Sequence, residues 1–372
     1  MMTLPPEPVC AMALTRVKGL SFAAALQVYQ AAGSATALFA ARGDLRAFLP
    51  DVHPRVAAAM RQSDDALLRA EAEWELCQRE GIGVSCLNDE GYPARLRNCP
   101  DAPLVLFHKE ASCLSERHVV AVVGTRHVTE QGKDTVRRLC AELAETVPDV
   151  VVVSGLAYGV DIQAHRGALA EGLRTVAVLA HGFDRIYPAV HRTTAVEMLT
   201  RGGLVTEYMT GTVPDKGNFV RRNRIVAGLV DACVVVESAS KGGALITARL
   251  AGEYDRDVFA FPGRVTDPYS EGCNRLIASN QAQLLTCGGA LAEAMGWTVK
   301  KEKGKPVQRE LFAELTEEEA ALCRLLNGTD GVQLNMLAVR SGIPVQQVSN
   351  IMFDLEMRGI VRMIPGSIYR LV

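Results

Sequence analysis

The sequence lacks the patterns that mark several large classes of protein. No apolar run approaches the ~20 residues needed to span a bilayer, and the N-terminal stretch MMTLPPEPVCAMALTRVKGL has no basic region ahead of its apolar residues. The ten cysteines include no C-x-x-C pair, and several stand inside apolar runs, such as Cys233 in DACVVVES. We therefore expect buried thiols in a cytoplasmic protein that is neither exported nor inserted into a membrane.

The sequence also lacks a strong charge imbalance and the common phosphate-binding loops. With 40 Lys and Arg against 42 Asp and Glu, the formal net charge is −2, so any nucleic-acid site must be a local basic patch. There is no G-x-x-x-x-G-K-[ST] loop, and Gly155 and Gly159 do not have G-x-G-x-x-G spacing. These absences disfavour ATP hydrolysis, and we expect no cofactor and no metal site.

A chain of 372 residues is long enough for two or three structural units. From Leu14 to Glu80 the pattern is rich in Ala and Leu at helical spacing, interrupted by Gly and Pro turns such as VKGL and LPDVHP. This predicts a small all-helical domain over residues 1–82. Gly turns between helices sometimes bind DNA phosphates, but packing or partner docking is the favoured interpretation.

Short β-branched runs separated by helical stretches begin near Glu116: HVVAVVG, DVVVVSG, RTVAVLAHG, GLVTEY, DACVVVES and DVFAFPG. Runs of apolar residues without alternation suit strands buried on both faces. Their alternation with helices predicts a doubly wound, Rossmann-like α/β domain with a parallel sheet over residues 83–298. Ligands of such sheets bind beyond the carboxyl ends of the strands, so we expect the site there.

A Lys-, Gly- and Pro-containing stretch, residues 299–310, reads as a linker, and residues 311–372 have the layout of a winged helix-turn-helix. Thr316 and Glu319 have capping-box spacing, and a terminal hairpin is expected through Pro365–Gly366. The expected recognition helix, Val345 to Arg358, carries Gln346, Gln347, Ser349 and Asn350 but one arginine. Because a DNA reader usually brings more positive charge, protein contact is favoured over DNA reading.

Two turns that follow expected strands have features of phosphate sites. In AVVGTR, Thr125 and Arg126 stand at the mouth of the following helix, where free backbone N–H groups attract phosphate. In ESASKGGALIT, Lys241 precedes two glycines and a helix that starts near Ala244. The alternative for both turns is an ordinary exposed cation.

The segment VVSGLAYGVDIQAHRGAL places Asp161 and His165 four residues apart, on one face of an expected helix. An acid–base pair is one interpretation. A structural hydrogen bond is favoured, because no nucleophile or set of metal ligands accompanies them.

The segment NFVRRNRIVAGL contains three arginines within an expected helix. At 100° per residue, Arg222 falls inside the apolar arc, Arg224 falls outside it, and Arg221 lies on its margin. Because an unpaired buried guanidinium is very costly, we expect Arg222, in the first helical turn, to emerge over the carboxyl edge of the sheet. The alternative is an intramolecular ion pair, for instance with Glu207 or Glu237.

Five motifs in order, VVGTR, SGLAYGVDIQAHRGAL, GNFVRRNRIVAGL, VVVESASKGGALITARLAGEYDRDVFAFPG and GCNRLI, resemble the DNA-processing protein A family (DprA, also called Smf) over roughly Glu116 to Ala294. The flanks resemble that family's N-terminal domain, of sterile-alpha-motif or helix-hairpin-helix type, and its winged helix. The resemblance implies a protein without catalysis that binds single-stranded DNA and dimerises through its Rossmann-like domain. It further implies loading of RecA recombinase onto incoming DNA during natural transformation, in the presence of single-strand-binding protein.

The resemblance also implies a set of DNA-binding residues. It assigns phosphate contacts to the cations Arg126, Lys216, Arg222 and Lys241, and base stacking to Phe219. It assigns close approach of the backbone to the turn residues Gly124, Thr125, Gly242 and Gly243. The RNR motif adds Asn223 and Arg224. Cations with one aromatic platform also meet the needs of sequence-tolerant single-strand binding. One departure is Val220, which stands where the family usually has proline.

Two other functions remain open on the sequence. A nucleotide-processing enzyme on the same scaffold would use Asp161, His165 and Glu237 as acid–base groups, although SKGGALIT replaces the PGG-x-GT turn of such enzymes. A transcription regulator would use the winged helix to read duplex DNA, with the central domain as a ligand sensor.

Overall fold

The computed structural model describes residues 5–297, 315–327, 329, 331–364 and 366–371. The chain divides into two compact units, Met1–Lys301 and Glu302–Val372. The helical and Rossmann-like regions thus belong to one unit. The predicted linker, residues 299–310, lies outside the described residues.

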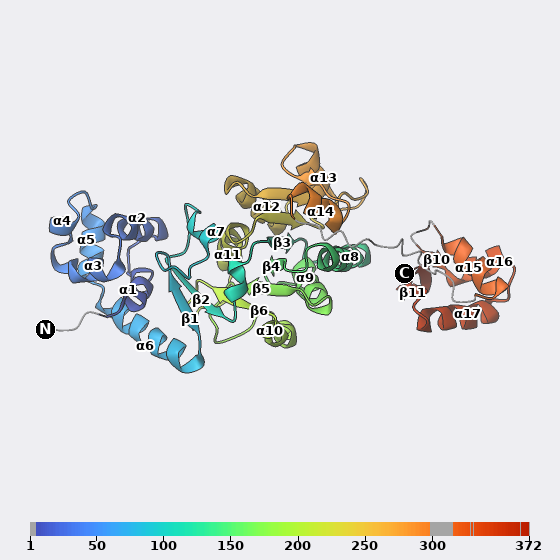
Figure 1. Cartoon of the computed structure of the whole chain (residues 1–372), viewed down its shortest axis with the longest axis horizontal. Helices are drawn as coiled ribbons and strands as arrows, with labels where there is room; N and C mark the ends of the chain where they lie inside the picture. The colour runs from blue at the N-terminus through green and yellow to red at the C-terminus, as the bar shows by residue number, and fades with distance from the viewer. Residues whose placement is uncertain (1–4, 298–314, 328, 330, 365, 372) are drawn as a thin grey trace. The chain divides into compact units, whose positions relative to one another are not determined.

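The first unit begins with a group of helices, drawn in blue in Figure 1. Their bounds are α1 Glu7–Leu14, α2 Phe22–Ala32, α3 Ala35–Ala40, α4 Leu45–Phe48, α5 Pro54–Arg61 and α6 Asp64–Glu80. Ser21 caps α2 by accepting a hydrogen bond from the Ala24 amide, and Gly33 ends that helix with a φ of 75°. A residue with a side chain adopts this conformation only with strain, so glycine is needed there. The prediction of short helices joined by turns is confirmed.

The main sheet has nine strands among the described residues, in the order β1-β2-β6-β5-β4-β3-β7-β8-β9. Their bounds are β1 Gly83–Cys86, β2 Val105–Lys109, β3 Val119–Val123, β4 Val151–Ser154, β5 Arg174–Val178, β6 Gly202–Thr206, β7 Ala232–Val235, β8 Asp257–Ala260 and β9 Gln283–Leu284. The six predicted strands are β3 to β8, and they pair in parallel. The predicted parallel sheet is confirmed for these strands, and the sheet continues at one edge with antiparallel pairs, of β2 with both β6 and β1.

Helices cover both faces of this sheet. Val120, Val122 and Val152 pack in one apolar cluster with residues of α8 and α9. The alternate positions, such as Val151 and Val153, pack in another cluster with residues of α11 and α12. The bounds of the helices in this region are α7 Ala94–Arg97, α8 Glu130–Thr146, α9 Val160–Ala170, α10 Arg192–Met198, α11 Lys216–Gly228, α12 Gly243–Glu253, α13 Glu271–Ala278 and α14 Gly288–Ala294. Burial on both faces explains why the strands are continuously apolar.

The strand order reverses at β3. From β3 the chain builds β4, β5 and β6 on one side and then returns to place β7 and β8 on the other. A crevice outside the carboxyl ends of the strands is expected where the order reverses. The topology therefore directs attention to the segments that follow β3, β4 and β7.

The second unit contains α15 Glu317–Leu326, α16 Leu334–Ser341, α17 Val345–Met357 and a small sheet of β10 Val332–Gln333, β11 Val361–Ile364 and β12 Ile368–Leu371. The predicted capping box is present: Glu319 N donates to Thr316 Oγ1, and Thr316 N donates to the Glu319 carboxylate. The helix expected from Val345 is also confirmed, and β11 and β12 form the expected hairpin, with Pro365 of its turn outside the described residues. Strand β10 was not predicted from the sequence. This unit is a winged helix.

Two further predictions concern the cysteines, expected as buried thiols, and the helices, none of which was expected to span a membrane. All ten cysteines are unpaired thiols, and all are buried except Cys287, which is half-buried. None of the helices that the structure describes combines the length and hydrophobicity needed to cross a bilayer.

Candidate functional site

A pocket of about 600 Å³ opens where the carboxyl ends of β3 and β4 meet the segments before α11 and α12. Its walls come from five parts of the chain that are far apart in sequence. Nine of the eleven predicted site residues line it: Gly124, Thr125, Arg126, Lys216, Phe219, Arg222, Asn223, Gly242 and Gly243. Arg224 and Lys241 do not. The topology and the family motifs thus point to the same place.

Arg222 forms part of the floor of this pocket. Its side chain is buried, and its Nη1 donates to Gly155 O at 2.7 Å and also to Val178 O. These carbonyls lie at the ends of β4 and β5, so Arg222 does reach the carboxyl edge of the sheet. It does so from the second turn of α11 rather than the first, because the helix begins at Lys216. Burial lowers the pKa of Arg222, and the nearby Asp161 carboxylate opposes that shift.

Arg224 lies elsewhere, and its expected position outside the buried face of the helix is corrected. Its side chain is buried, its Nη2 pairs with Glu207 Oε2 at 2.5 Å, and its Nη1 donates to Asp101 O. The guanidinium also lies 4.8 Å from the ring centroid of Phe22, in α2. The helical wheel failed here because α11 is covered on two sides, by the sheet and by the N-terminal helices. Glu207, which the sequence offered as an alternative ion-pair partner of Arg222, thus pairs with Arg224 instead.

The GTR turn after β3 supplies a cation, but its amides do not form a helix terminus. Thr125 N donates to Glu237 O at 2.7 Å, and Thr125 O accepts from Val160 N. Helix α8 begins only at Glu130, so the expected position of Thr125 and Arg126 at the mouth of that helix is wrong. The two backbone bonds instead fix the turn and leave the exposed Arg126 side chain at the pocket.

Phe219 lies within α11, whose start is capped by Asp215 Oδ1 accepting from Asn218 N at 2.9 Å. Phe219 and Val220 are therefore consecutive helical residues, with no turn between them. The phenyl ring is half-buried and is held by two side chains: Arg126 Cζ lies 5.0 Å from its centroid, and the Tyr187 ring lies 5.6 Å away. Contact with these side chains fixes the ring without the family's proline.

The turn before α12 contributes its glycines but not its lysine. Gly242 and Gly243 line the pocket, and α12 begins at Gly243. The first N–H groups of a helix have no acceptor within the helix, so they favour an anion. Lys241 is exposed on the same turn, outside the lining.

The charges around the pocket favour a polyanion at its mouth. Arg126 and Lys216 are exposed at the rim, and Arg222 lies at the floor. The opposing carboxylates are Asp215, which caps α11, and Asp161, which is buried and accepts from Gly155 N at 3.1 Å. Burial raises the pKa of Asp161, and the Arg222 charge counters that shift.

The candidate acid–base residues are not gathered in one site. Asp161 lines the pocket, whereas His165 is fully buried with Nδ1 2.7 Å from Thr175 Oγ1. Glu237 accepts from Thr129 N and Thr129 Oγ1 at the start of α8, and it lines a different pocket. Within the described residues, no group of three or more His, Cys, Asp or Glu could hold a metal ion.

Tyr187 is an aromatic lining residue that the sequence reasoning missed. It follows β5 in the segment AHGFDRIYP, and the residue is 44% exposed. The rule that sites gather beyond strand ends applies to β5 as it does to β3 and β7. An aromatic residue in that segment was therefore an available signal.

Comparison with known proteins agrees with this geometry. Residues 83–296 match the family described as DNA recombination-mediator protein A, and residues 308–367 match the DprA winged helix domain. Protein Smf of Escherichia coli is 35% identical over 289 residues, 76% of each chain.

Two solved structures are also similar. DNA processing protein A from Streptococcus pneumoniae has a TM-score of 0.65 at 33% identity, covering 76% of this chain and 95% of that one. The DNA processing protein A of Helicobacter pylori, described for its single-stranded DNA binding mode, has a TM-score of 0.52 at 30% identity, covering 57% and 95%. With the family match spanning more than half of its length, this chain belongs to the DprA/Smf family of DNA recombination-mediator proteins.

Proposed function

We propose that this protein binds single-stranded DNA in the pocket at the carboxyl edge of its sheet. The observation that carries the proposal is one pocket that combines exposed cations, a buried arginine and an aromatic ring: Arg126, Lys216, Arg222 and Phe219. Cations for phosphates and a planar ring for bases together give single-strand binding without sequence preference. A double helix hides its base faces and could use only the cations.

The proposal divides the work between exposed and buried cations. Arg126 and Lys216 are exposed and contact phosphates directly, so their contribution weakens with salt. Arg222 already donates to two carbonyls, and it adds charge beneath the strand while holding α11 in place. Gly242 and Gly243 allow the backbone to approach a phosphate closely.

We further propose that the protein acts without catalysis as a recombination mediator in the cytoplasm. In this role it loads RecA recombinase onto single strands that enter during natural transformation, alongside single-strand-binding protein, and works as a homodimer through the Rossmann-like domain. Membership of the DprA/Smf family and similarity to a protein studied for single-stranded DNA binding support this role.

A nucleotide-processing enzyme is the weaker candidate, because its three acid–base residues are separated. His165 is enclosed in the core and Glu237 caps α8, so Asp161 has no catalytic partner in the pocket. A calorimetric screen that detects a tightly bound nucleotide would revive this candidate.

A winged-helix transcription regulator is also disfavoured. Helix α17 contains no Lys or Arg from Val345 to Met357, and it exposes Phe353 and Met357 by 60% and 73%. A helix that enters the major groove usually brings positive charge for the phosphates, which this helix lacks, rather than exposed apolar side chains. This face suits protein contact, and we expect residues 311–372 alone to prefer no duplex sequence.

The function is tested by binding of labelled oligonucleotides at several salt concentrations, single-stranded against duplex. We expect tighter binding of the single strand, with an affinity that falls steeply as salt rises. Equal affinity for both forms, or binding insensitive to salt, contradicts the proposal.

A further inference from the structure

We propose that Tyr187 is a second base-stacking residue of this pocket and presents the more accessible ring, with Phe219 supporting it from behind. The inference rests on the proposed function and deepens it. It concerns the contact with bases rather than with phosphates.

The surroundings of Phe219 restrict its role as a stacking platform. Its ring is half-buried, with the Arg126 guanidinium over it at 5.0 Å and the Tyr187 ring at 5.6 Å with an interplanar angle of 51°. A cation over an aromatic face is itself a favourable contact. These two contacts and the half-burial of Phe219 restrict the access of a base to its ring.

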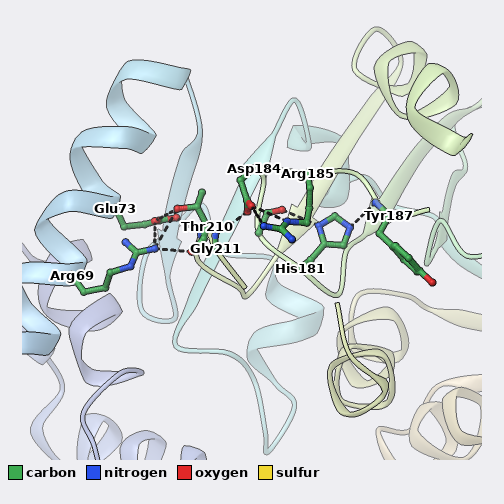
Figure 2. Close-up of polar contacts among 9 residues, drawn as sticks. Arg69, Glu73, His181, Asp184, Arg185, Tyr187, Thr210 and Gly211 are labelled. Carbon is green, nitrogen blue, oxygen red and sulfur yellow. Dashed lines mark hydrogen bonds and ion pairs between the residues drawn. The ribbon is translucent and has the colours of Figure 1, made fainter. Parts of the chain in front are cut away.

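Tyr187 has the exposure that Phe219 lacks. Its side chain lines the same pocket and is 44% exposed. Figure 2 shows the ring extending away from the loop that carries it, with its hydroxyl at the far end. A partly exposed tyrosine that contacts a neighbouring ring offers a rigid platform at a low entropy cost, since only two side-chain torsions are fixed.

The backbone that presents Tyr187 is held in place. Tyr187 N donates to His181 Nε2 at 3.1 Å, and His181 Nδ1 is 2.8 Å from Gly182 O. Because Nδ1–H donates to that carbonyl, Nε2 is free to accept, and the imidazole is neutral in this arrangement. Burial, the main influence, lowers the pKa of His181 and favours this neutral form.

A second set of bonds fixes the same loop to the segment before α11, as Figure 2 shows. Asp184 Oδ1 accepts from Gly211 N at 3.0 Å. The neighbouring Thr210 is bound by Glu73 of α6. A loop held at both ends keeps its aromatic ring beside Phe219 before any DNA arrives, so little ordering is needed on binding.

The test uses the full-length chain with Tyr187→Phe, Tyr187→Leu and Tyr187→Ala, and two ligands of equal length: oligothymidylate and an abasic strand. Loss of one stacked base weakens binding by roughly 5- to 150-fold. We expect such a loss for Tyr187→Leu and Tyr187→Ala on oligothymidylate, with an unchanged salt dependence. Tyr187→Phe retains wild-type affinity. On the abasic strand all four proteins bind alike.

Tyr158→Ala is the matched control, since Tyr158 is 47% exposed in the same domain but does not line the pocket. Wild-type affinity for oligothymidylate in Tyr187→Leu overturns the inference. So does a loss in Tyr187→Phe equal to that in Tyr187→Leu, because the hydroxyl would then be the contact. Failure of the wild type to bind either strand removes the proposed function itself.

Discussion

Arg222 Nη1 donates to Gly155 O at 2.7 Å, so a side chain of α11 is bonded directly to the end of β4. The same nitrogen also donates to Val178 O at the end of β5. A residue assigned to DNA by sequence motif is therefore also a tie between a helix and two strands. Substitutions of Arg222 affect the fold and the ligand site together.

Replacing Arg222 with alanine should lower stability as well as DNA affinity. Two buried carbonyls lose their donor, and a buried hydrogen bond to a charged group contributes about 1.5–3 kcal/mol. We expect the free energy of unfolding in urea to fall by about 2–4 kcal/mol. Arg221→Ala is the control, because Arg221 is exposed on the same helix, and it should change stability by less than about 0.5 kcal/mol. Equal free energies of unfolding for Arg222→Ala and Arg221→Ala contradict a structural role for the Arg222 hydrogen bonds.

Gly155→Ala should act through the same contact. A Cβ built on Gly155 meets the Arg222 guanidinium well inside van der Waals distance, whereas one built on Gly243 meets nothing within 4 Å. Overpacking of this kind costs about 1–3 kcal/mol, and displaced Arg222 should also weaken DNA binding. Thermal unfolding of the two variants checks this: Gly155→Ala should melt lower and Gly243→Ala close to wild type. A lower melting temperature for Gly243→Ala than for Gly155→Ala would contradict the predicted clash with Arg222.

Glu73 should stabilise the segment that leads into α11. Its carboxylate is buried and accepts from Thr210 N at 2.8 Å, from Thr210 Oγ1 at 2.6 Å and from Arg69 Nη2 at 2.7 Å. Glu73→Ala removes the acceptor of the half-buried Thr210 amide and the ion-pair partner of Arg69, which still donates to Thr210 O. The change should cost about 1–3 kcal/mol of the free energy of unfolding.

The expected signature of Glu73→Ala is faster hydrogen exchange in residues 207–214, together with weaker DNA binding, although Glu73 is not a pocket residue. Glu75→Ala, an exposed change on the same helix, should leave both unaltered. Unchanged exchange in Glu73→Ala would show that the N-terminal helices do not hold this segment.

His165 should make stability depend on pH. Burial, aided by the Arg222 charge and by His191, lowers the pKa of His165 to about 3 in the folded chain. The unfolded chain takes up this proton near pH 6.5, so stability is lost as pH falls from about 6.5 towards 3, at about 1.4 kcal/mol per unit. Urea unfolding at pH 7 and pH 5 should show a smaller difference in His165→Gln than in wild type.

His127→Gln, at an exposed histidine, should keep the full pH dependence. A residual dependence should remain in His165→Gln, because burial also lowers the pKa of His108 and of His181. An identical difference between pH 7 and pH 5 in wild type and His165→Gln contradicts the assignment.

Much of the fold follows from local patterns. Strands buried on both faces leave uninterrupted apolar runs, and this is why β3 to β8 are readable while the half-exposed β1 and the two-residue β9 are not. The capping box at Thr316 can also be predicted, because all the residues that form it lie within one helical turn. The antiparallel edge depends on pairing between distant segments, and no local signal records it.

Most residues of the candidate site could be predicted from sequence motifs, whereas their burial and their contacts could not. The sequence motifs identify Arg126 and Lys216 as candidate phosphate-binding cations. The burial of Arg224 depends on contacts with Glu207 and Phe22, which are distant in sequence and adjacent only in the folded chain. A helical wheel assumes one covered face, and α11 has two. Tyr187 was missed because its role depends on proximity to Phe219 rather than on its own sequence motif.

The most direct measurement of the central claim is the salt dependence of oligothymidylate binding by wild type, Arg126→Ala and Arg249→Ala. Arg126 is exposed at the pocket, whereas Arg249 is exposed away from it in an ion pair with Glu253. Removing one phosphate contact should reduce the slope of log affinity against log salt by about 0.7. We predict weaker binding and a shallower slope for Arg126→Ala, with Arg249→Ala equal to wild type. Equal slopes for all three proteins would contradict binding of single-stranded DNA in this pocket.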